Sequence, residues 1–130
     1  CEPYIRRKAL RHLEKKRVVI FAAGIGSPYF TTDTCTALRA KEMMADSIFM
    51  GKNGVDGVFT ADPRKDSSAK LIDKITYHEI LAKGLQVMDS TAVGLLEDTD
   101  IDIRVFNMAD PENAVRLIRG EKIGTLISRK

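Results

Sequence analysis

The sequence has few of the residues that build disulfide, zinc or redox sites. It contains no tryptophan, two cysteines (Cys1 and Cys35) and two histidines (His12 and His78) among 130 residues. Two cysteines are too few for a disulfide framework, and their spacing is not that of a metal motif. The histidines are far apart in the sequence, so a zinc site is not expected. This cysteine usage predicts a reducing, cytoplasmic location.

Long apolar runs are also missing. Every apolar run is much shorter than the roughly 18 residues that a membrane span needs. The first ten residues, CEPYIRRKAL, lack the apolar core of a secretory signal. With 44% hydrophobic and 30% charged residues, the composition is that of a globular chain and excludes disordered and collagen-like classes. The length fits one domain or a piece of one, and the missing initiator methionine favours a piece.

Positive charge is concentrated at the start of the chain. Residues 1–17 hold seven of the 21 Lys and Arg and two of the 18 acidic residues, a net of +5, which leaves −2 for the remainder. A basic helix can bind nucleic acid or phosphate, but a solvated helix face explains the same pattern, and we favour the solvated face. Only Tyr4 provides an aromatic ring among these charges, so stacking on single-stranded nucleic acid is not expected.

Apolar patterning predicts alternating helices and strands. The continuous run from Val18 to Ala22 is typical of a strand that is buried on both faces, as in a parallel sheet. We expect further strands at 47–50, 58–60, 101–106 and 123–127, and helices at 3–16, 31–45, 76–83, 90–98 and 111–120. This alternation predicts a layered α/β sheet. Ligands bind such sheets at the carboxyl ends of the strands, which directs attention to the loops after 18–22 and 47–50.

The first candidate site is the loop from Gly24 to Thr32 with the helix start behind it. Glycines let backbone N–H groups approach a ligand, and a helix N-terminus attracts anions, so the segment is a candidate phosphate cradle. An ordinary strand-to-helix turn, capped by Thr31, Thr32 or Asp33, explains the composition equally well. The segment matches neither the P-loop nor the dinucleotide fingerprint.

The second candidate site runs from Gly51 to Pro63. Asn53 offers an amide for base or ribose edges, and Phe59 offers a ring that can pack on a nucleobase. Asp62 can accept ribose hydroxyls or help to hold hydrated magnesium. Two consecutive turns, with Asn-Gly and Asp-Gly serving backbone geometry alone, are the alternative that local composition favours.

The order of these segments resembles the bacterial uridylate (UMP) kinases of the amino acid kinase superfamily. The matching blocks are GIGSPYFTTDT (24–34), KNGVDGVFTADPRKD (52–66), GLQVMDSTA (84–92) and VFNM (105–108). The resemblance covers the whole chain but only the C-terminal part of a family member. It implies a three-layer α/β/α sandwich with a mostly parallel central sheet. Residues 1–130 would be the C-terminal part of a single amino acid kinase domain whose N-terminal part is absent.

The resemblance also implies a reaction and a set of site residues. The family transfers the γ-phosphoryl of ATP to UMP, giving UDP and ADP, with Mg²⁺, in pyrimidine nucleotide biosynthesis. Asn53, Phe59 and Asp62 would contact ATP, and no residue is assigned as a metal ligand. Asp33 stands where related kinases hold an acidic residue that organises catalytic lysines. The UMP-binding loop would consist of Ile25, Gly26, Ser27, Pro28, Tyr29, Phe30, Thr31 and Thr32.

Two departures from the family pattern affect these expectations. Many members have Thr at the position of Ile25 and Asn at that of Ser27, so a uracil contact at Ile25 must use the backbone. The family's phosphate-binding lysine, N-terminal glycine-rich segment and ribose-binding acidic residue lie upstream of this sequence, so the 130 residues alone are expected to be inactive. For the complete protein, the resemblance implies a homohexamer that responds to GTP and UTP.

Three other functions are kept as alternatives. One is a superfamily member that phosphorylates a carboxylate such as aspartate, glutamate or carbamate. Another is a nucleotide-binding regulatory module without turnover, and the third is an RNA-binding protein that uses residues 6–17. The lack of a Ser-His-Asp or Cys-His arrangement is consistent with transfer to a phosphate oxygen. That oxygen is already anionic and needs no general base.

Overall fold

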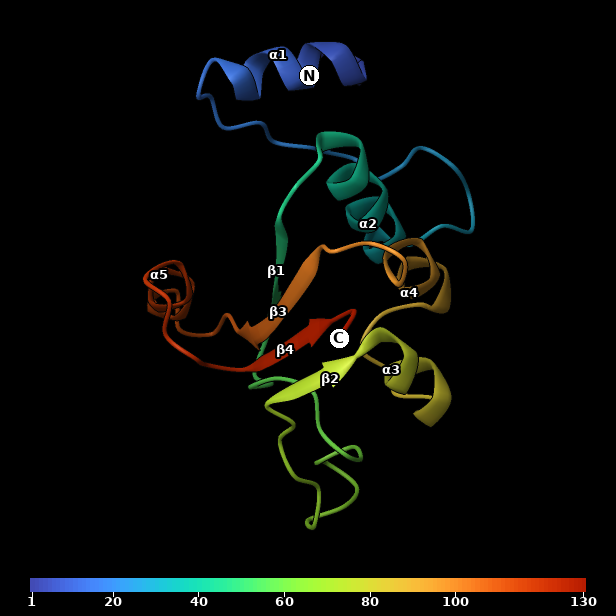
Figure 1. Ribbon diagram of the computed structural model, residues 1–130, viewed down its shortest axis with the longest axis vertical. Coiled ribbons are helices and arrows are strands. Elements are labelled where there is room, and N and C mark those ends of the chain that lie inside the picture. Colours follow the sequence, from blue (N-terminus) through green and yellow to red (C-terminus); the bar gives the residue numbers. More distant parts are fainter.

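The computed structural model describes all residues from 1 to 130 and contains a mixed sheet flanked by helices (Figure 1). No helix is both long enough and apolar enough to cross a membrane. The helices and strands, in chain order, are α1 (Arg6–Glu14), α2 (Thr32–Met43), β1 (Ser47–Lys52), β2 (Lys74–Thr76), α3 (Tyr77–Lys83), α4 (Ser90–Leu96), β3 (Asp102–Asn107), α5 (Glu112–Ile118) and β4 (Thr125–Ser128).

The four strands form one sheet in the order β1-β3-β4-β2. The β1–β3 and β2–β4 pairs are parallel, and β3–β4 is antiparallel, with Ile103 opposite Ile127. In Figure 1, α5 lies on one side of the sheet, whereas α2, α3 and α4 lie on the other. The predicted three-layer architecture with a mostly parallel sheet is confirmed.

The core lies between the sheet and the layer of α2, α3 and α4. Ile103, Ile127 and Leu96 are fully buried, and Tyr77 is almost so. The Tyr77 hydroxyl donates a hydrogen bond of 2.6 Å to the backbone carbonyl of Ile101, so its polar end is satisfied inside an apolar environment. Burial, with a smaller contribution from the charge of Asp102, raises the pKa of Tyr77 well above its ordinary value.

Helix ends follow local sequence chemistry closely. Thr76 and Glu79 form the predicted capping box at the start of α3, and Gly84 ends that helix in the left-handed conformation with φ 60°. The predicted helix at 3–16 is confirmed in its centre, but it begins at Arg6, three residues beyond Pro3. The strands predicted at 47–50, 101–106 and 123–127 are present with small shifts of their ends.

The strand predicted from Val18 to Ala22 is wrong for this chain. The segment has no strand pairing, and Val18 and Ile20 are 91% and 86% exposed. A continuous apolar run becomes a buried strand only when other strands pair with its edges and side chains cover its faces. No strand within residues 1–130 pairs with it.

Two further differences concern short strands. The strand predicted at 58–60 is reduced to an isolated antiparallel bridge between Phe59 and Leu71. Conversely, β2 was not predicted, because a three-residue strand is too short to display an apolar period. Residues 62–70 form turns, as expected.

A polar cluster fastens the N-terminal segment to α2. The Tyr4 hydroxyl donates a hydrogen bond of 2.6 Å to the Glu42 carboxylate, which also accepts one of 2.6 Å from Arg39. The Arg39 guanidinium stacks 3.6 Å from the centre of the Tyr4 ring. Burial raises the pKa of Glu42, but the hydrogen bonds from Tyr4 and Arg39 outweigh it and hold the pKa below its ordinary value.

The buried hydroxyl of Thr125 provides the first prediction. It accepts a hydrogen bond of 2.8 Å from the Val58 amide and donates one of 2.6 Å to the Ile72 carbonyl, and the residue is fully buried. Thr125→Val keeps the shape but leaves both backbone groups without a partner, so we expect a loss of about 1–3 kcal/mol in the free energy of unfolding. Equilibrium unfolding in urea measures it.

Thr125→Ser is the matched control, because it keeps the hydroxyl and removes one methyl group. It should lose less stability than Thr125→Val. If Thr125→Ser were the more destabilised variant, packing of the methyl group rather than hydrogen bonding would explain the role of Thr125.

Candidate functional site

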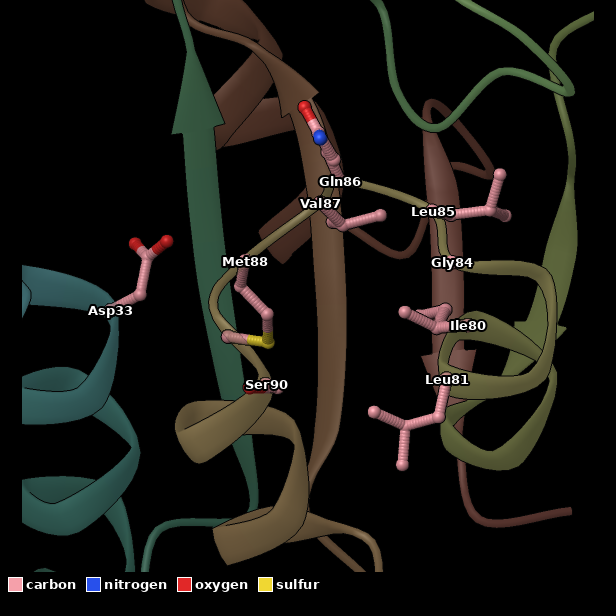
Figure 2. A pocket seen from close by; sticks show the side chains of 9 residues that line it. All are labelled: Asp33, Ile80, Leu81, Gly84, Leu85, Gln86, Val87, Met88 and Ser90. Atoms are coloured by element: carbon pink, nitrogen blue, oxygen red, sulfur yellow. The ribbon is translucent and has the colours of Figure 1, made fainter.

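Two cavities share one backbone segment, Gly84–Val87, which lines both. The first cavity has a volume of about 420 Å³ and lies between the start of α2, the end of α3 and the segment that leads into α4 (Figure 2). The second has a volume of about 520 Å³ and is bordered by the loop that follows β1. The residues after α3 therefore form a common wall between two concave sites.

Asp33 lines the first cavity. In Figure 2 it lies on α2, across from Ile80 and Leu81 of α3. The cap of α2 is Thr31, whose hydroxyl accepts a hydrogen bond of 3.2 Å from the Thr34 amide. Capping by Asp33, an alternative that the sequence left open, is therefore wrong. Asp33 lies within the first turn, where its charge complements the helix dipole.

The second cavity brings together two of the three residues predicted to contact ATP. Phe59 and Asp62 line it, together with Lys52 and Arg64, whereas Asn53 is not among its lining residues. One carboxylate oxygen of Asp62 accepts a hydrogen bond of 3.0 Å from the Arg64 amide. The cavity thus offers an aromatic ring, a carboxylate and two cations, a combination suited to a nucleotide.

The loop predicted to bind UMP is open to solvent. Residues 26–32 are all exposed, and Tyr29 is fully so. Gly24 and Gly26 have positive φ angles, as a loop built from glycine allows, but Tyr29 adopts φ 69° without that freedom. Ile25 and Gly26 border a third cavity of about 410 Å³, which α1 closes on its other side.

Asp89 is a site residue that the sequence did not single out. Its carboxylate caps α4 through the Ala92 amide at 2.9 Å and also accepts hydrogen bonds from the hydroxyls of Thr31 and Thr34. Burial raises the pKa of Asp89, but these hydrogen bonds outweigh it and lower the pKa below its ordinary value. The Asp-Ser-Thr order predicts a cap, but nothing local reveals partners more than 50 residues away.

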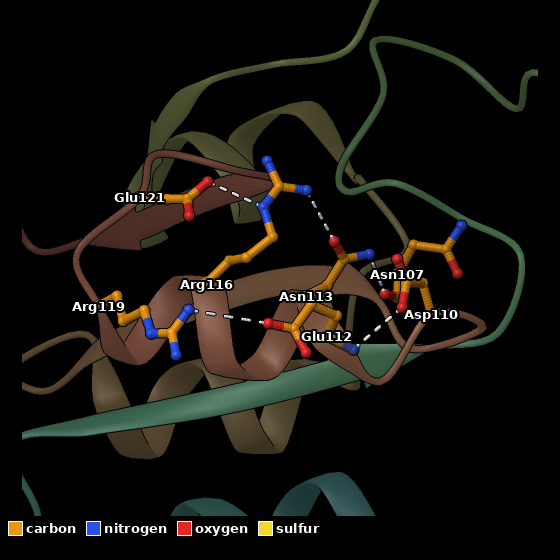
Figure 3. Close-up of polar contacts among 7 residues, drawn as sticks. All are labelled: Asn107, Asp110, Glu112, Asn113, Arg116, Arg119 and Glu121. Carbon is orange, nitrogen blue, oxygen red and sulfur yellow. Dashed lines mark hydrogen bonds and ion pairs between the residues drawn. The ribbon is translucent and has the colours of Figure 1, made fainter.

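Asn107, at the end of β3, is a second residue without an expected role. Its amide nitrogen donates to Asp56 at 3.0 Å, and its amide oxygen accepts from the Gly54 backbone at 3.2 Å. On the α5 side, Asn113 donates to the Asn107 carbonyl at 2.9 Å, within the polar network of Figure 3. Asn107 therefore fixes the turn that leads into the second cavity.

No group of three or more His, Cys, Asp or Glu side chains in the chain is arranged to hold a metal ion. Asp33 and Asp62 line different cavities, so they do not form a metal-binding pair across one of them. Kinases commonly hold Mg²⁺ by substrate phosphates and water with only one or two carboxylates.

Comparisons with known proteins agree with this geometry. The family model described as "Amino acid kinase family" matches residues 2–107. A uridylate kinase of Streptococcus thermophilus is 60% identical over all 130 residues. The crystal structure of UMP kinase from Bacillus anthracis superposes with a TM-score of 0.95 at 43% identity over 99% of the chain. Uridylate kinase from Archaeoglobus fulgidus has a TM-score of 0.76 at 34% identity over 97% of the chain.

The chain spans about half the length of the relatives that it matches. It covers 53% of the Streptococcus thermophilus protein, 53% of the Bacillus anthracis chain and 59% of the Archaeoglobus fulgidus chain. The resemblance stated from the sequence motifs is confirmed by these matches.

The left-handed conformation of Gly84 provides the second prediction. A Cβ atom at Gly84 would meet nothing within 4 Å, so the cost of Gly84→Ala arises from its φ of 60° alone. We expect a loss of about 1–2 kcal/mol in the free energy of unfolding, because alanine disfavours this conformation. Urea denaturation measures it.

Gly94→Ala is the matched control. Gly94 lies inside α4, and a Cβ atom there also meets nothing within 4 Å, but its φ is not positive. Alanine should therefore stabilise the protein by roughly 0.5–1 kcal/mol. Equal effects of the two substitutions would contradict the role of the turn at Gly84.

Proposed function

Because the chain belongs to the amino acid kinase family, we propose that it is the C-terminal part of a kinase that transfers the γ-phosphoryl of ATP to UMP. The observation that carries the proposal is the second cavity, which Phe59, Asp62, Lys52 and Arg64 line together. Phosphoryl transfer requires two nucleotides to meet with their phosphates in line. The segment Gly84–Val87 joins this cavity to the first cavity, which Asp33 at the start of α2 lines. The relatives' names, UMP kinase and uridylate kinase, give the acceptor.

ATP is assigned to the second cavity. Phe59 would pack on the adenine, and Asp62 would accept ribose hydroxyls. Lys52 and Arg64, which line the same cavity, would balance phosphate charge. Asn53 is retained as an ATP contact from the family resemblance, although it lies outside the lining of this cavity. Mg²⁺ would enter with ATP as part of the substrate.

UMP is assigned to the loop from Ile25 to Thr32, which precedes α2. Its exposed backbone and the unpaired N–H groups at the start of α2 would hold the acceptor's phosphate. Since Ile25 has no side-chain donor, the uracil would be recognised there through the backbone. Asp33, which faces the first cavity from the same helix turn, would orient cationic groups around the transferring phosphoryl.

The protein itself has little covalent chemistry to carry out in this reaction. The attacking oxygen of UMP is ionised at neutral pH, so no side chain has to remove a proton from it. The protein aligns the two phosphates and balances their charge while they approach. The family resemblance implies that the lysines used for this purpose would lie upstream of residue 1. We therefore place the complete active site in the full-length protein, together with its homohexameric assembly, GTP and UTP responses and cytoplasmic location.

The acceptor is the first point to test. The full-length protein incubated with ATP and Mg²⁺ should form UDP from UMP and should not phosphorylate aspartate, glutamate or carbamate, as followed by coupled ADP assay and product chromatography. The chain 1–130 alone should form no UDP.

Nucleotide binding without turnover would favour a regulatory module. Salt-sensitive RNA binding that is lost on neutralising Arg6, Arg7 and Arg11 would favour an RNA-binding protein.

The role of Asp33 gives a separate prediction. Asp33→Asn in the full-length protein should reduce kcat by about tenfold or more, because the amide no longer orients cations by charge. KM for ATP should change little. Asp110→Asn is the control, since Asp110 precedes α5 on the other side of the sheet. Unchanged turnover in Asp33→Asn would contradict the catalytic role.

A further inference from the structure

We propose that Asp89 is a positioning residue for the acceptor nucleotide: it holds Thr31 and Thr34, and through them the end of the UMP loop and the start of α2, in the geometry that binds the acceptor. The inference rests on the proposed function for the identity of the acceptor. It assigns a role to a residue outside the predicted contacts, which acts through two threonines rather than by touching substrate.

The contacts converge on one carboxylate. Thr34 lies within hydrogen-bond distance of both Asp89 oxygens, at 2.9 Å and 3.0 Å, and Thr31 donates its hydroxyl proton to Oδ2. Thr31 in turn accepts the Thr34 amide hydrogen as the cap of α2. Because Thr31 donates in one direction and accepts in the other, the orientation of its hydroxyl is fixed.

Capping of α4 does not account for this arrangement. A cap needs one acceptor for one amide, and the Ala92 amide at 2.9 Å from Oδ1 fulfils that need. Serine would do the same with its short side chain. The second oxygen, Oδ2, accepts hydrogen bonds from Thr31 and Thr34 at the start of α2, and the length of the aspartate side chain allows it to reach them. Thr34 is only 3% exposed, so its hydroxyl has no solvent alternative to Asp89.

These contacts fix the position of the first turn of α2. A second contact, from Lys41 near the end of α2 to the Leu95 carbonyl at 2.9 Å, also joins α2 and α4. With both ends fastened to α4, the first turn of α2 has a defined position relative to the first cavity, which Asp33 and Ser90 both line. Several hydrogen-bond donors stabilise the negative charge of the Asp89 carboxylate. They weaken the repulsion that this charge would otherwise exert on an anionic ligand nearby.

The test compares variants of the full-length protein in steady-state kinetics. Asp89→Ser keeps a cap for α4 but cannot reach both threonines, and Thr34→Val removes one donor while leaving Asp89 intact. Each should raise KM for UMP by roughly tenfold, the effect of losing about 1.4 kcal/mol of binding, with KM for ATP within about twofold. Thr34→Ser, which restores the hydroxyl, should behave like the wild type.

Two comparisons separate positioning from stability. The double variant Asp89→Ser with Thr34→Val should be no worse for UMP than the poorer single variant, because Asp89→Ser already removes the contact that Thr34→Val removes. Asp110→Ser, which removes a carboxylate bonded to the Glu112 amide at the start of α5, should leave both KM values unchanged. A stable Asp89→Ser protein with wild-type KM for UMP, or a Thr34→Ser protein as impaired as Thr34→Val, would overturn the proposal.

Hydrogen exchange provides a readout that does not depend on the reaction. In Asp89→Ser, the amides of Thr34 and Cys35, which both donate to Thr31, should exchange faster while those of α4 keep their protection. Unchanged exchange at Thr34 and Cys35 would overturn the positioning role. If the wild-type protein does not phosphorylate UMP, the proposed function fails, and faster exchange at these two amides would still support the contact between Asp89 and α2.

Discussion

The position of β3 between two differently oriented neighbours is the constraint from which the rest of the structure follows. β3 pairs in parallel with β1 and antiparallel with β4, and Ile103 and Val105 are buried beneath the helices. The parallel pair brings the carboxyl ends of β1 and β3 together at one edge, so Asn107 can hold the loop that follows β1. The second cavity takes its shape from that loop.

The two cavities differ in the charge of the side chains that line them. The second cavity has two cations, Lys52 and Arg64, beside Asp62. The first has only Asp33 as a charged lining residue, and its other walls are largely apolar. The lining of the first cavity therefore supplies no cation of its own.

Local structures that depend only on residues close together in the sequence were predictable. The Thr76–Glu79 capping box and the helix end at Gly84 involve residues within a few positions of each other, and both were predicted. The segment Val18–Ala22 failed for the opposite reason. Its apolar side chains describe a strand that needs pairing partners, and the chain described here supplies none to it. An apolar pattern indicates that a segment needs pairing strands and covering side chains, but it does not show whether the rest of the chain provides them.

The same reasoning explains which site residues were found and which were missed. Phe59 and Asp62 were predicted from side-chain chemistry and line one cavity, but chemistry alone did not exclude Asn53 from it. Asp89 and Asn107 bind partners 51 to 58 residues away, a relation that no local spacing encodes. The cap of α2 shows the limit most clearly. Thr31, Thr32 and Asp33 were equivalent candidates in the sequence, and Thr31 accepts the Thr34 amide hydrogen while its hydroxyl proton goes to Asp89. With Thr31 at the cap, Asp33 lies in the first turn of α2 and lines the first cavity.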